Sequence, residues 1–123
     1  MIRTVTWVAR RVTEPARDQA RAMARALGLS VVLDEPGKLL VTTADGDLLE
    51  YLTGDQARPG YLFDGQDTVV GFLVEDLTAA VDALAAAGFA AIGTGGEGEG
   101  VRFRHVRGPG GVAYGLIERT GTR

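Results

Sequence analysis

The chain has no cysteine and only one histidine, His105, among its 123 residues. Without cysteine it forms no disulfide, and it has neither thiol catalysis nor sulfur-ligated metals. A single histidine excludes any site built from several. No apolar run approaches the roughly 18 residues that a membrane span needs, and the N-terminus lacks the apolar core of a signal peptide. We therefore expect a cytoplasmic protein with no membrane partner.

Positive charge is also scarce, because 13 Lys and Arg residues stand against 16 Asp and Glu, for a formal net charge of −3. Nucleic-acid binding needs a basic stripe, and the scattered charges form none, so no nucleic-acid partner is expected. The hydrophobic fraction of 46% is enough to build a core. This composition predicts one ordered domain over residues 1–123.

Two stretches of the sequence are similar to each other. Aligning residues 7–16 (WVARRVTEPA) with residues 69–78 (VVGFLVEDLT) matches Trp7 with Val69, Val8 with Val70, Val12 with Val74 and Glu14 with Asp76. Each copy continues into an alanine-rich helix that ends near a glycine, followed by three apolar stretches separated by turns. We therefore predict two βαβββ modules, residues 1–53 and residues 67–123, joined by a linker over residues 54–66.

Local signals place the helices within these modules. Proline in a first-turn position predicts a helix over residues 15–27 that Gly28 ends, with its arginines in solvent. Asp76 is expected to cap the second helix. After a short strand over residues 90–92, the glycine-rich residues 93–100 are expected to form a mobile hairpin loop and not a phosphate site, because they open no helix.

The strand pattern predicts an α+β fold in which a curved mixed sheet surrounds a cavity. Successive side chains of a strand point to opposite faces, and apolar residues occupy both. The helices cover one face, so another sheet or a ligand must cover the second. Trp7 and Glu50 are expected to share this second face. Residues of this face and of the neighbouring strands form the predicted ligand site: Trp7, Arg11, Leu48, Glu50, Leu52, Val69, Gly71, Phe103, His105 and Gly115.

Residues 74–89 (VEDLTAAVDALAAAGF) and residues 106–118 (VRGPGGVAYGLIE) carry a family resemblance. They resemble the second module of the vicinal oxygen chelate superfamily, which includes glyoxalase I, bleomycin-resistance proteins, extradiol dioxygenases and fosfomycin-resistance enzymes. Residues 11–15 (RVTEP) and residues 27–29 (LGL) match the first module. The resemblance covers nearly the whole chain and implies the doubled βαβββ fold.

The resemblance also implies four metal-ligand positions, which fall here on Trp7, Glu50, Val69 and Gly115. Of the four residues, only Glu50 has a side chain that can bind a metal, whereas catalytic metal sites normally use about three protein ligands. We therefore expect no metal and no other cofactor.

Glu50 is left as the main candidate for chemistry. Either it acts as a base or binds a cationic ligand group in an apolar cavity, or it is a vestigial carboxylate that is hydrated or paired with Arg11. Trp7 is either a stacking wall for a planar ligand or a core residue. His105, beside Phe103, either contacts a ligand or is a satisfied strand histidine.

The resemblance favours a metal-free small-molecule-binding protein similar to the bleomycin-resistance branch, which sequesters or carries an antibiotic or a hydrophobic metabolite. The alternative is a metal-free lyase, isomerase or cyclase of glyoxalase-like fold that uses Glu50 as general base. Relatives of this size commonly pair, and an unpaired sheet edge invites pairing, so we expect a homodimer.

Overall fold

The computed structural model describes residues 2–98 and 100–120. The chain runs twice through a βαβββ series, as the sequence predicts. The first series consists of β1 (Ile2–Arg11), α1 (Glu14–Ala26), β2 (Ser30–Glu35), β3 (Lys38–Thr42) and β4 (Leu48–Leu52). The second consists of β5 (Thr68–Val74), α2 (Leu77–Ala86), β6 (Ala90–Gly98), β7 (Val101–Arg107) and β8 (Ala113–Arg119).

Two compact units make up the structure. The first unit is Thr6–Val69, and the second unit is Val70–Arg123 with the residues up to Val5. Two 3-10 turns, η1 (Gly54–Gln56) and η2 (Gly60–Phe63), follow β4 in the first unit. The module boundaries and the linker predicted from the sequence stay a prediction. Neither helix of the described residues is long and apolar enough to cross a membrane.

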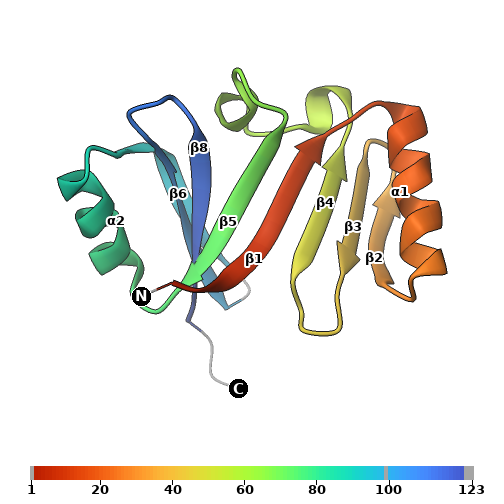
Figure 1. The fold of residues 1–123 in the computed structure, drawn as a ribbon, viewed down its shortest axis with the longest axis horizontal. Helices are drawn as coiled ribbons and strands as arrows, with labels where there is room; N and C mark the ends of the chain where they lie inside the picture. Colours follow the sequence, from red (N-terminus) through yellow and green to blue (C-terminus); the bar gives the residue numbers. More distant parts are fainter. Residues whose placement is uncertain (1, 99, 121–123) are drawn as a thin grey trace. The chain divides into compact units, whose positions relative to one another are not determined.

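In the first unit a four-stranded mixed sheet runs in the order β2-β3-β4-β1, with β1 parallel to β4 and the other pairs antiparallel. Helix α1 lies along one face of this sheet (Figure 1). Thr13 caps the helix, because its hydroxyl accepts a hydrogen bond from the Ala16 backbone N–H at 3.3 Å. The small residues Ala20 and Ala24 bring the helix close to Leu39 and Val41 of the sheet.

The arginines of α1 do not all lie in solvent, so this expectation was wrong. Arg17 and Arg21 both reach Asp34 on β2, and their side chains are only 11% and 19% exposed. The register pairs Asp34 with Leu39, whose side chain packs under the helix, so Asp34 points toward α1. Hydrogen bonds from Arg21 hold the pKa of Asp34 below its usual range, and the charge of Arg21 and the contact with Arg17 act in the same direction, whereas burial opposes the shift.

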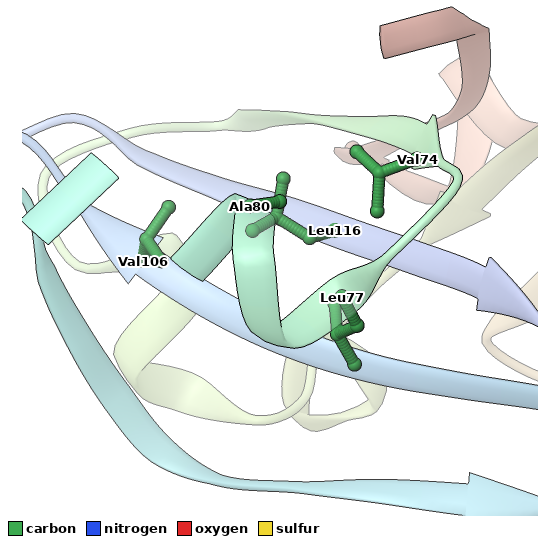
Figure 2. Packing of buried hydrophobic residues seen from close by; sticks show 5 residues of the cluster. All are labelled: Val74, Leu77, Ala80, Val106 and Leu116. Carbon is green, nitrogen blue, oxygen red and sulfur yellow. The ribbon is translucent and has the colours of Figure 1, made fainter. Parts of the chain in front are cut away.

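In the second unit a sheet of order β5-β8-β7-β6 carries α2 on one face. As predicted, Asp76 caps this helix by accepting a hydrogen bond from the Ala79 backbone N–H at 3.0 Å. A small core lies beneath it, and Figure 2 shows its residues. They are Val74, Leu77, Ala80, Val106 and Leu116.

The glycine-rich segment predicted as a mobile loop is part of strand β6, which extends to Gly98. Its register with β7 shifts between Ile92 and Gly96, as at a β-bulge. Gly95 has a φ of +71°, which L-residues rarely adopt. The prediction failed because glycines that would weaken an ordinary strand are the residues a bulge requires.

Candidate functional site

Trp7 and Glu50 meet on the face of the first sheet that lies opposite α1. The β4 neighbours of Glu50, Leu49 and Tyr51, pack on the helix side, so Glu50 points the other way. The register places Ala9 beside Glu50 and Trp7 beside Leu48, which brings the indole across the carboxylate. Trp7 Nε1 donates a hydrogen bond to Glu50 Oε1 at 3.0 Å.

Lys38 completes this group, and sequence reasoning missed it. Its Nζ lies 3.4 Å from Glu50 Oε2, and the side chains of Lys38 and Glu50 are 34% and 15% exposed. The antiparallel register pairs Leu40 with Glu50, and Lys38 precedes Leu40 by two residues on the same face. The alternation of β3 would have revealed Lys38 once its pairing with β4 was known. We call Trp7, Lys38 and Glu50 the Glu50 site.

Arg11 does not pair with Glu50. Its guanidinium binds the Asp67 carboxylate, with Nη2 2.8 Å and Nε 3.1 Å from Oδ1. The guanidinium carbon also lies 5.8 Å from the centre of the Phe63 ring, within the range of a cation–π contact. Arg11 therefore binds Asp67 and Phe63. The ion-pair partner of Glu50 is Lys38, and not Arg11 as the sequence suggested.

The other predicted site residues of the first unit differ in exposure. Leu48 is half-buried beside Trp7, whereas Leu52 is 3% exposed and Val69 is fully buried. Leu48 therefore borders the Glu50 site, while Leu52 and Val69 are core residues in the structure. Ligand contact by any of the three stays a prediction.

The remaining predicted residues lie together in the second unit. Gly71 pairs with Gly115 across β5 and β8, and His105 pairs with Gly115 across β7 and β8. The rings of Phe103 and His105 are 5.2 Å apart at an angle of 40°. His105 is buried, and this burial, with a smaller effect of the charge of Arg104, lowers the pKa of its imidazole.

The metal positions implied by the family resemblance do not fit a divalent cation. The indole nitrogen of Trp7 carries a hydrogen and has no lone pair to give to a metal. The side chains of Val69 and Gly115 have no atom that could bind one. The oxygens of Glu50 already accept a hydrogen bond from an indole and pair with an ammonium group. Among residues 2–98 and 100–120, no group of three or more His, Cys, Asp or Glu side chains is arranged to hold a metal ion.

The sequence matches no protein-family model, and it matches no curated protein. Solved structures do match it. Methylmalonyl-CoA epimerase from Mycobacterium tuberculosis has a TM-score of 0.70 at 17% identity, over 98% of this chain and 90% of the epimerase. A variant of the Streptomyces coelicolor methylmalonyl-CoA epimerase, in complex with 2-nitronate-propionyl-CoA, has a TM-score of 0.64 at 17% identity, over 98% of this chain and 100% of that one.

A hypothetical protein from Bacillus halodurans is also similar, with a TM-score of 0.67 at 15% identity over 98% of this chain and 96% of that protein. Methylmalonyl-CoA epimerase is a member of the vicinal oxygen chelate superfamily. The fold predicted from the sequence resemblance is therefore confirmed: the chain has the α+β fold of that superfamily. Identities this low show the fold alone.

Proposed function

We propose that this protein binds a small organic molecule at the Glu50 site and does so without a divalent metal. The observation that carries the proposal is the position of Glu50, a largely buried carboxylate held between Trp7 Nε1 and Lys38 Nζ. A carboxylate has about four lone-pair directions, so each oxygen keeps acceptor capacity for a ligand. The half-buried indole beside it supplies an apolar, planar contact surface.

The arrangement favours recognition over metal chemistry. The ammonium of Lys38 lies where a cation would have to approach Glu50 Oε2, and two like charges at this distance repel each other. A ligand that presents an N–H or an O–H to Glu50, and a flat apolar part to Trp7, matches the site. We therefore keep the sequestering or carrying of an antibiotic or a hydrophobic metabolite as the leading function.

The second candidate is a metal-free isomerase. It is favoured by the structural neighbours, two of which are methylmalonyl-CoA epimerases, one in complex with 2-nitronate-propionyl-CoA. In such a reaction Glu50 would take a proton from a carbon next to a carbonyl group, and the enolate would then receive a proton from water on its opposite face. Lys38 would then stabilise the negative charge that develops on the carbonyl oxygen.

A thermal-shift screen with aromatic natural products and thioester metabolites tests the proposal. A ligand at about 100 times its dissociation constant stabilises the folded protein by roughly 2.7 kcal/mol. Glu50→Gln should reduce the shift caused by a true ligand. Glu118→Gln is the matched control, because it removes one charge from a similar ion pair, with Arg102, in the other unit. Equal shifts in both variants would contradict the proposal.

Deuterium incorporation separates the two candidates. An isomerase in D₂O exchanges the proton next to the carbonyl of its substrate, and this exchange should fall by roughly 100-fold in Glu50→Gln. A carrier or sequestering protein binds the same compound and catalyses no exchange.

We further propose a homodimer in the cytoplasm. Strand β2 is an outer strand of its sheet, and Val32 on it is 57% exposed, which leaves an apolar residue at an edge open to pairing. Sedimentation at micromolar concentration should show twice the mass of the 12.9 kDa chain. A monomer under these conditions would refute the homodimer and leave the Glu50 site untouched.

A further inference from the structure

The second unit contains an apolar cavity between α2 and its sheet, on the face opposite His105 and Gly115. Its volume is about 270 Å³. Nine residues line it, all of them apolar or aromatic, and the only side-chain polar group among them is the hydroxyl of Tyr114. Ala83, one of the lining residues, is exposed, so the cavity opens to solvent beside α2.

The cavity exists because α2 carries short side chains where the sheet carries rings. Ala80 and Ala83 are the alanines of α2 that line it. The sheet residues Phe72 and Tyr114 stay only partly buried beneath the helix. Four of the five core residues shown in Figure 2 also line the cavity, so the cavity lies directly against this core; they are Val74, Ala80, Val106 and Leu116.

Three aromatic rings shape the cavity. The ring centres of Phe72 and Tyr114 are 6.0 Å apart at 31°, and those of Phe89 and Tyr114 are 6.5 Å apart at 54°. All three residues line the cavity. Separations and tilts of this kind are those that aromatic rings prefer, so a further ring has faces and edges to pack against.

We propose that this cavity is a binding site for a small uncharged aromatic molecule of one or two rings. An apolar cavity of about 150 Å³ stays dry and takes up benzene, so one of 270 Å³ has room for a larger ring system. The lining has no charged group to pair with a carboxylate or an ammonium, so it favours an uncharged ligand. The site is independent of the Glu50 site, which belongs to the first unit.

Titration of the protein with indole, followed by NMR of its methyl groups and its tryptophan N–H, tests the proposal. Indole should shift the resonances of Leu84 and Val106, which line the cavity, in a saturable manner. Indole also fits the Glu50 site proposed above, so any shift of the Trp7 Nε1–H resonance should follow a separate titration curve that Ala83→Leu leaves unchanged. Benzoate, a charged ring of similar size, should leave the Leu84 and Val106 resonances in place.

Ala83→Leu places a larger side chain at the cavity and should weaken indole binding at least about tenfold. Ala83→Met is the second variant, since its flexible side chain fills the same space if the leucine variant folds poorly. Ala79→Leu is the matched control, because Ala79 is an exposed residue of the same helix that does not line the cavity. This variant should bind indole like the unmodified protein.

Two results would overturn the proposal. One is the absence of saturable shifts on adding indole. A changed sedimentation coefficient of Ala83→Leu would then indicate that a second copy of the chain covers the cavity. The other is a saturable indole shift of Leu84 and Val106 that survives both substitutions at Ala83.

Discussion

The indole N–H of Trp7 donates a 3.0 Å hydrogen bond to the carboxylate of Glu50, across two parallel strands and 43 residues of sequence. The bond fixes the orientation of both side chains on the face of the first sheet opposite α1. Trp7 is the only tryptophan of the chain, so its fluorescence and its indole N–H resonance report directly on Glu50.

Trp7→Ala should weaken the binding of a planar ligand by about 1–3 kcal/mol, because it removes both stacking and apolar contact area. Trp7→Phe keeps an aromatic face and loses only the N–H donor, so its loss should be smaller. Calorimetric titration of both variants checks this order. Equal losses would mean that the hydrogen bond to Glu50, and not the ring, is what the ligand depends on.

Asp34→Asn should lower the free energy of unfolding at neutral pH, because Arg17 and Arg21 lose their shared carboxylate. The pKa of Asp34 is lowered in the folded protein, so its contribution is present above the usual Asp value of 3.8 and is lost as the pH falls below it. Denaturant unfolding at several pH values should show the variant and the unmodified protein converging in acid.

Asp18→Asn is the control for this prediction. Asp18 also contacts Arg21, but its side chain is 63% exposed, so its removal should cost less. A larger effect at Asp18 than at Asp34 would contradict the assignment of Asp34 as the centre of the cluster.

His105 should make stability depend on pH in a defined window. Burial lowers the pKa of its imidazole below the ordinary 6.5, so the unfolded chain binds the proton first. Stability is therefore full above pH 6.5 and decreases as the pH falls from there toward the lower pKa of the folded protein. Because the chain has one histidine, His105→Gln should remove most of the difference in unfolding free energy between about pH 7.5 and about pH 5.5. If the difference in unfolding free energy stays unchanged in His105→Gln, the pH dependence arises from other titratable groups.

Gly95→Ala should destabilise the second unit by about 1–3 kcal/mol, since a non-glycine residue at a φ of +71° is strained. The added Cβ would also lie 2.6 Å from the carbonyl oxygen of Phe103 and against the side chain of Arg104. Gly98→Ala is the control, because nothing lies within 4 Å of its added Cβ. Thermal unfolding of both variants should separate them, and equal losses would argue against the bulge at Gly95.

Much of the fold follows from local signals in the sequence. The cap at Asp76, the helix start at Pro15 and the period-2 alternation that puts Trp7 and Glu50 on the face opposite the helix each depend on a few neighbouring residues. Lys38 and Asp34 were missed because their partners are set by the pairing register of β3 with β4 and of β2 with β3. Local sequence does not fix such a register.

The second unit shows a further limit. The glycine-rich residues 93–100 predicted a loop, and only the pairing of β6 with β7 shows a bulge within a strand between Ile92 and Gly96. The cavity beside Ala83 was also hidden, because an alanine-rich helix face predicts close packing. Whether the rings of Phe72 and Tyr114 pack against these alanines depends on how the sheet is curved beneath α2.

The central claim is that the Glu50 site binds a small molecule without a metal, and the Trp7 indole N–H resonance tests it most directly. The account predicts that a ligand found by screening shifts this resonance saturably in protein treated with a chelator. The same ligand should shift it much less in Glu50→Gln, and normally in Glu118→Gln. Ligands that bind only after a divalent cation is added, or that bind without moving the Trp7 resonance, would contradict the account.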